Sequence, residues 1–213
     1  MKSKHLNQKK YAKAKFDSHQ VTLFPYQPLC GIYRSYAQIL TAAKLPSFFP
    51  TETDFVYPSA MPTNEFLVLD NFLLLFASRT QSLSINARYI VKNDIDLPQL
   101  EYQLSTSLFK LITELKIDIK QINPDNILNA FNTSLSKHAI YDLNTLHCEK
   151  PRCELSLDLL AKLIGCSRNQ LLYQQKQIND AYSIKVQQLK QKCVALQHPE
   201  PSSDLFWRAS HGN

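Results

Sequence analysis

The second half of the chain carries apolar residues at spacings of three and four. Between Leu97 and about Leu115 they mark one face of an amphipathic helix: Leu100, Leu104, Leu108, Leu111, Ile112 and Leu115. Asn123 followed by Pro124 has the form of an N-cap with proline at the first helical position, so another helix is expected to begin there. The pattern stays helical to about Gln197.

The first half of the chain has a different pattern of apolar and proline residues. Prolines break the segment from Val21 to about Pro62, and Tyr33 to Lys44 is the only good helix candidate within it. Next come a strand candidate, a buried-helix candidate and a second strand candidate: Glu65 to Leu69, Phe72 to Arg79 and Ala87 to Val91. The predicted fold class is therefore α+β, a small α/β part followed by an all-helical region with a long C-terminal helix. The expected divisions are a basic flexible tail (1–20), an α/β domain (21–97), a helical domain (98–180) and a C-terminal helix and tail (181–213).

The segment Leu155 to Gln177 fits the pattern of a helix-turn-helix. With Leu157 as the first position, Ala161 is the fifth, Gly165 the ninth and Leu171 the fifteenth. A small residue at the fifth position permits close helix contact, and glycine at the ninth can take the left-handed conformation that ends a helix. The eighteenth position, usually apolar, is Gln174, so the packing offset can shift by a residue. The alternative is an ordinary helical hairpin.

In this motif the second helix is the recognition helix, about Ser167 to Gln177. Ser167 stands where an N-cap belongs. Its exposed side would carry Arg168, Asn169, Gln170 and Tyr173 as candidates for reading bases, because these side chains match the hydrogen-bonding edges of the major groove. Ser167 and Lys176 are better suited to phosphates.

Charge supports an anionic partner. The formal net charge is +6. Six lysines precede the first acidic residue, Asp17: Lys2, Lys4, Lys9, Lys10, Lys13 and Lys15. We expect Lys9 and Lys10 in particular to contact the DNA backbone without sequence preference. The alternative is a solvated tail that only aids solubility.

After the motif, apolar residues repeat at spacings of four, three, four and three: Tyr182, Val186, Leu189, Cys193 and Leu196. This is a heptad seam of about two heptads, which indicates a partner helix and a possible homodimer. A dimer would suit a palindromic site. The alternative is the buried face of a terminal helix.

The run from Thr63 to Asp94 resembles the ParB/sulfiredoxin-like domain. In that family a strand leads into an Asp-Gly-His/Asn-Arg-Arg turn, then a helix and a second strand. Here Leu69-Asp70-Asn71-Phe72-Leu73 stands at the turn, so Asp70 is the only position that carries over. The resemblance implies a partition-type protein that binds centromere-like DNA through a later helix-turn-helix. Many members also bind a cytidine nucleotide, but the turn here lacks the glycine and both arginines.

The sequence offers little for catalysis. It contains no nucleophile elbow, Walker loop or His-Glu-x-x-His motif. His147, Cys148 and Cys153 form a weak zinc motif without a second arm, so we expect no metal and no cofactor. Five dispersed cysteines, and an apolar run at Phe66 to Ala77 too short to cross a bilayer, favour a cytoplasmic protein with no membrane partner.

The sequence therefore predicts a non-enzymatic protein that binds double-stranded DNA, of partition or transcription-regulator type. The leading alternative is a protein-interaction adaptor in a larger assembly, in which the helical hairpin is structural. A third possibility is a nucleotide-dependent enzyme on the ParB-like scaffold.

Overall fold

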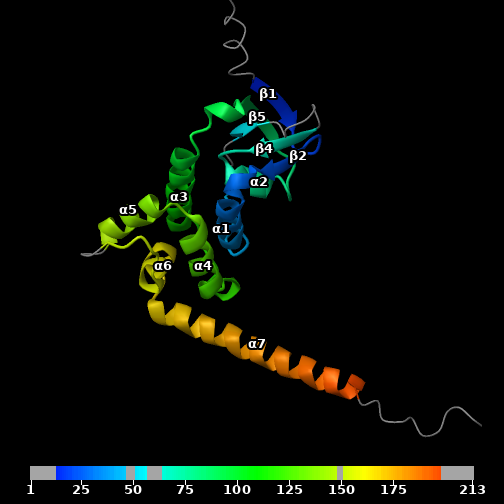
Figure 1. Cartoon of the computed structure of the whole chain (residues 1–213), viewed down its shortest axis with the longest axis vertical. Helices are drawn as coiled ribbons and strands as arrows, with labels where there is room; N and C mark the ends of the chain where they lie inside the picture. The colour runs from blue at the N-terminus through cyan, green and yellow to red at the C-terminus, as the bar shows by residue number, and fades with distance from the viewer. Residues whose placement is uncertain (1–12, 47–50, 57–63, 148–150, 198–213) are drawn as a thin grey trace, which may run out of the picture. The chain divides into compact units, whose positions relative to one another are not determined.

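The computed structural model describes residues 13–46, 51–56, 64–147 and 151–197, and its side chains from Lys15 to Val194 within those ranges (Figure 1). The chain divides into two units, residues 1–174 and 175–213, which are described separately. The first is an α+β structure in which a five-stranded sheet precedes a mostly helical region, and the chain ends in a long helix, as the sequence predicted.

The sheet has the strand order β1-β5-β3-β4-β2. Its strands are β1 (Lys13–Asp17), β2 (Thr22–Pro25), β3 (Glu52–Val56), β4 (Glu65–Val68) and β5 (Ser84–Tyr89). β1 runs antiparallel to β5 and β3 antiparallel to β4, whereas β3–β5 and β2–β4 are parallel pairs. The predicted strand–helix–strand unit is present as β4, α2 and β5, but β3 lies between its two strands.

The prediction that residues 1–20 form a flexible tail is wrong for residues 13–17, which form β1. Polar and apolar residues alternate in this segment, Lys-Ala-Lys-Phe-Asp, as in a strand with one buried face. The Phe16 ring stacks on Phe66 with centroids 4.8 Å apart. The charge of the lysines is typical of a tail, whereas their alternation with Ala14 and Phe16 is typical of a strand.

One face of the sheet is apolar and is covered by α2 (Phe72–Ala77). Leu74 of α2 packs there against Phe55, Phe66, Ile85 and Ala87. The opposite face carries charged and amide side chains of β1, β3 and β5: Lys15, Glu52, Asp54, Asn86 and Arg88. This division gives the sheet one buried and one solvated face.

The helices that follow are α3 (Leu97–Glu114), α4 (Pro124–Ser134), α5 (Lys137–His147), α6 (Leu157–Ile164) and α7 (Arg168–Gln197), and α1 (Cys30–Leu40) precedes β3. Short 3₁₀ turns occupy Gln27–Leu29, Lys92–Asp94 and Ile119–Gln121. The predicted N-cap at Asn123 is present, because its side chain accepts a hydrogen bond from the Asn126 N–H at 3.1 Å.

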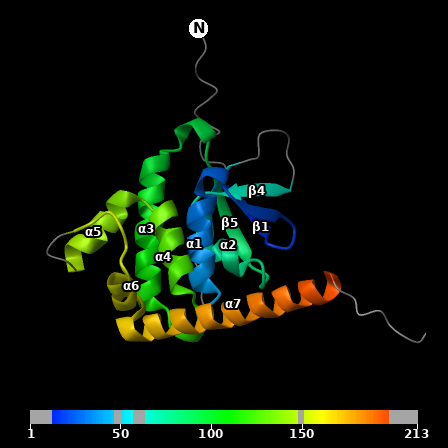
Figure 2. The ribbon, with the colours of Figure 1, turned by 60° about the horizontal axis from the view of Figure 1, so that its bottom comes forward.

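The predicted boundary between residues 97 and 98 does not separate two compact units. α1 packs against α3 and α4, and the three helices lie side by side (Figure 2). Helices α1 and α4 approach closely at Gly31, since a Cβ built there would lie 2.8 Å from the Ser134 hydroxyl oxygen of α4, and Ser134 would have to shift. One continuous core joins Tyr36, Phe72, Leu108 and Phe131. The C-terminal helix also begins earlier than predicted, at Arg168 instead of about residue 181.

Within the described part of the chain, no helix combines the length and the apolar character that crossing a bilayer requires.

Candidate nucleic-acid interface

Two buried or partly buried asparagines fix the loop that leads into α6. The Asn144 amide nitrogen donates to the carbonyls of Ile140, Arg152 and Glu154 at 2.9–3.1 Å. Asn132 makes two hydrogen bonds with Leu155, accepting from its N–H at 2.7 Å and donating to its carbonyl at 3.1 Å. Because both amides satisfy backbone groups, the start of the hairpin is held against α4 and α5.

α6 is capped at both ends by local interactions. Ser156 accepts from the Leu159 N–H at 3.2 Å, which satisfies one donor of the first turn. At the other end Gly165 takes the left-handed conformation with φ +76°. The Gly165 N–H then bonds to the Lys162 carbonyl, and the Cys166 N–H to the Ala161 carbonyl at 3.0 Å. This pair of bonds is the Schellman arrangement, so Gly165 acts as the sequence predicted.

The next helix begins with a reciprocal cap. The Ser167 hydroxyl accepts from the Gln170 N–H at 3.2 Å, and the Gln170 amide oxygen accepts from the Ser167 N–H at 2.8 Å. A Ser-x-x-Gln capping box of this kind stabilises a helix start. It engages the Gln170 side-chain oxygen, so any contact that Gln170 makes outward must come from its NH₂ group.

α7 is anchored by a buried leucine and by a glutamine. Leu171 is fully buried in the core with Leu160 and Ala161 of α6. Gln174, the departure from the motif, donates to the Lys120 carbonyl at 2.9 Å and to the Ile122 carbonyl at 3.4 Å. An apolar side chain at this position would leave these carbonyls without that donor, which explains why a glutamine fits here.

The candidate base-reading residues of the first unit lie together on the start of α7. Arg168, Asn169, Gln170 and Tyr173 are all exposed, with Tyr173 65% accessible. Helical spacing places Asn169 and Tyr173 on the side opposite Leu171. Lys176 is exposed in the second unit. Lys9 and Lys10 lie outside the described residues.

Arg168 already has an anionic neighbour, which the sequence reasoning did not identify. Its Nε lies 3.4 Å from the Asp158 carboxylate of α6, and both side chains are more than half exposed. A solvent-exposed pair of this kind contributes at most about 1 kcal/mol. Arg168 can therefore exchange Asp158 for another acceptor at small cost.

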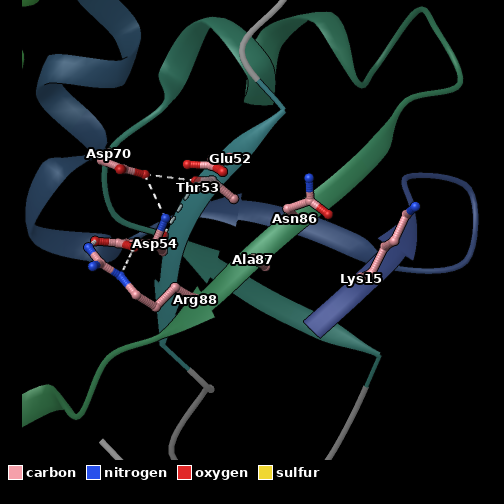
Figure 3. A pocket seen from close by; sticks show the side chains of 8 residues that line it. All are labelled: Lys15, Glu52, Thr53, Asp54, Asp70, Asn86, Ala87 and Arg88. Carbon is pink, nitrogen blue, oxygen red and sulfur yellow. Dashed lines mark hydrogen bonds and ion pairs between the residues drawn. The ribbon is translucent and has the colours of Figure 1, made fainter. Parts of the chain in front are cut away.

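A second candidate site, with a volume of about 500 Å³, lies on the polar face of the sheet (Figure 3). Arg88 of β5 makes a two-pronged ion pair with Asp54, its register partner on β3. Lys15, Glu52 and Asn86 line the same pocket. The residues belong to strands far apart in sequence, so no local motif could have indicated this cluster.

Asp70, the one residue shared with the ParB-like turn, fastens β3 to the start of α2. Its Oδ1 accepts from the Thr53 hydroxyl, the Asp54 N–H and the Asn71 N–H at 2.7–2.8 Å. Burial raises the pKa of Asp70, and these three hydrogen bonds oppose that rise. Asp70 therefore has a structural role at this turn, because its oxygen satisfies two backbone N–H groups and one hydroxyl.

The metal interpretation gains no support from geometry. Among the described residues, no group of three or more His, Cys, Asp or Glu side chains is arranged to hold a metal ion. Cys153 and Cys166 are free thiols, and Cys148 lies outside the described residues.

Comparisons with known protein families, curated proteins and solved structures found no match to this chain. The resemblance to the ParB/sulfiredoxin-like domain therefore stays a prediction from the sequence.

Proposed function

We propose that this protein binds double-stranded DNA through the helix-turn-helix formed by α6 and the start of α7. The observation that carries the proposal is the combination of a rigid turn and a polar exposed surface. Gly165 and the Ser167–Gln170 cap fix the turn, and Leu171 anchors the helix on one side. The opposite side presents Asn169 and Tyr173, and Arg168 is exposed in the first turn of the same helix.

These residues divide into two classes by chemistry. Arg168, Asn169 and the NH₂ group of Gln170 donate to acceptors on base edges, and Tyr173 can contact a base or sugar. Ser167, Lys176 and the N-terminal lysines, Lys9 and Lys10 among them, contact phosphates, because hydroxyl and ammonium groups supply position and charge without sequence information. In this scheme Asp158 releases Arg168 when the duplex arrives.

In cellular terms the proposal is a non-enzymatic, cofactor-free, cytoplasmic protein of partition or transcription-regulator type. The net charge of +6 agrees with an anionic partner. The predicted homodimer through the C-terminal helix stays a prediction, and the charges of that helix are considered below.

A specific observation also favours the adaptor function. Large apolar side chains of α7 are exposed beyond the hairpin, with Tyr182 69% and Leu189 61% accessible. Exposed apolar residues on a helix are typical of a surface that binds another protein. This second candidate needs no contact between Arg168 and DNA.

The test is a titration of a fluorescent duplex pool with the whole protein over a range of salt concentrations. Wild type is expected to bind with an affinity that falls steeply with salt. Replacing Lys2, Lys4, Lys9 and Lys10 by glutamine should lower the affinity for every duplex and flatten the salt slope. The change stops before Lys13 because β1 pairs with β5.

The matched control compares two exposed arginines, Arg168 on α7 and Arg34 on α1. Arg168→Ala should weaken binding to a preferred duplex by about 1–3 kcal/mol, whereas Arg34→Ala should leave it unchanged. Absence of binding at low salt would refute the DNA proposal and favour the adaptor.

A further inference from the structure

The second unit presents an apolar stripe along α7. Its residues are Tyr182, Val186, Leu189, Cys193 and Leu196, called the seam below. Tyr182, Leu189 and Cys193 are exposed and Val186 is partly exposed, while the side chain of Leu196 is not described. Alternating spacings of four and three keep these positions on one side of a helix. Ile184, 56% accessible, lies off this stripe.

The charged residues that flank the seam are all lysines. With Val186 and Cys193 as a positions, and Tyr182 and Leu189 as d positions, Lys185 and Lys192 take g positions and Lys190 takes an e position. All three lysines are exposed. The segment 181–197 contains no aspartate or glutamate. Residues at e and g choose the partner helix, because they lie beside the corresponding positions of that partner.

A second copy of this chain fits the seam poorly. In a parallel pair, Lys185 of one helix would lie beside Lys190 of the other, and an antiparallel pair would also bring lysines together. Like charges placed across an interface disfavour that pairing. The flanks instead match a helix with glutamate or aspartate at its e and g positions.

We propose that the seam binds an acidic amphipathic helix of a different protein. Duplex DNA is a weaker fit, because lysine–phosphate contacts would leave the seam exposed. The proposal uses none of the residues assigned to DNA and does not depend on that function. Together with the proposed function, it makes the protein a link between a duplex and an acidic partner.

The probe is a synthetic helical peptide of three heptads, with leucine at its seam positions and glutamate at e and g. A control peptide carries lysine at e and g. The full-length protein should bind the acidic peptide at least about tenfold more tightly than the basic one. Leu189→Glu should weaken acidic-peptide binding about tenfold or more, and Ile184→Glu should change it less than about twofold, although both variants add the same charge.

Charge reversal gives an independent readout. In the variant K185E/K190E/K192E the preference should switch to the basic peptide, which a nonspecific loss of folding would not produce. The proposal is overturned if wild type binds neither peptide, or binds both equally. It is also overturned if wild type dimerises alone in sedimentation and Leu189→Glu abolishes the dimer, since the occupant would then be a second copy. Duplex binding that falls as much in K185Q/K190Q/K192Q as in Arg168→Ala would assign the lysines to DNA instead.

Discussion

The two parts of α7 have the same secondary structure but differ in what they bury. From Arg168 to Gln174 the helix buries Leu171 and bonds to backbone carbonyls through Gln174, and it exposes polar groups together with Leu172 and Tyr173. From Gln175 onward the exposed side chains include large apolar ones, such as Tyr182 and Leu189. The first part is held by packing and capping contacts, and the second has no buried residue among those described.

The comparison indicates that helical structure alone does not determine the role of a segment, since both parts belong to one helix. Packing of one face normally supplies most of the stability of a helix in a protein. The first part of α7 has this support, so its polar surface can be held rigid for recognition. The second part lacks it, which is why we expect a partner to cover the seam.

The largest expected difference between the two parts of α7 is in the free energy of unfolding, when a leucine of each part is replaced by alanine. Leu171→Ala should lower the free energy of unfolding by about 2–5 kcal/mol, because it opens a cavity in the core. Leu189→Ala makes the same chemical change at an exposed site and should alter it by less than about 0.5 kcal/mol. Urea unfolding of both variants checks this, and equal losses would contradict the division of α7.

Changing Gly165 tests the turn that orients the first part. Gly165→Ala should destabilise the protein by about 1–2 kcal/mol, because the left-handed conformation is unfavourable for alanine. No atom outside its chain neighbours lies within 4 Å of a Cβ built there, so the loss would come from the backbone alone. Asn, which tolerates that conformation, should recover part of the loss in thermal or urea unfolding. If Gly165→Asn is no better than alanine, the backbone explanation fails.

Gln174 offers a smaller test of the anchoring. Gln174→Ala removes the donor to the Lys120 and Ile122 carbonyls and should cost about 0.5–1.5 kcal/mol of stability. Gln188→Ala, at an exposed position of the second part, is the control and should cost less. A loss at Gln188 as large as that at Gln174 in urea unfolding would show that the anchor is misassigned.

The smallest effect is expected at Asp158. Asp158→Asn removes a negative charge beside Arg168 and frees the guanidinium, so duplex affinity should rise by up to about fivefold, equivalent to ~1 kcal/mol. Stability should hardly change because the ion pair is exposed. Glu65→Gln on β4 removes the same charge from the sheet and should leave duplex affinity unchanged. Fluorescence anisotropy at moderate salt measures both, and a lower affinity for Asp158→Asn would argue against a DNA contact at Arg168.

The hairpin could be predicted because its determinants are local. Gly165, Ser167 and Leu171 lie within seven residues, and the capping and burial at these positions follow from their spacing. The Ser167–Gln170 cap could also have been found from the Ser-x-x-Gln pattern. Only Gln174 departed from the motif, and its explanation required the position of the Lys120 and Ile122 carbonyls.

The sheet was predicted less well because its partners are remote in sequence. β1 and β3 both pair with β5, and the register partners Asp54 of β3 and Arg88 of β5 lie 34 positions apart in the chain. The Asp54–Arg88 pair and the role of Asp70 depend on that pairing, so neither could be inferred from spacing. The merging of the expected domains has a similar cause, since the contact of Gly31 with Ser134 joins residues a hundred positions apart.

The most direct test of the central claim is selection from a randomised duplex pool at moderate salt, performed in parallel with wild type, Arg168→Ala and Arg34→Ala. The account predicts that wild type and Arg34→Ala enrich the same sequence motif, and that Arg168→Ala loses preference at one position of it. Retention of DNA without any enriched motif, or a motif unchanged in Arg168→Ala, would contradict recognition by the start of α7.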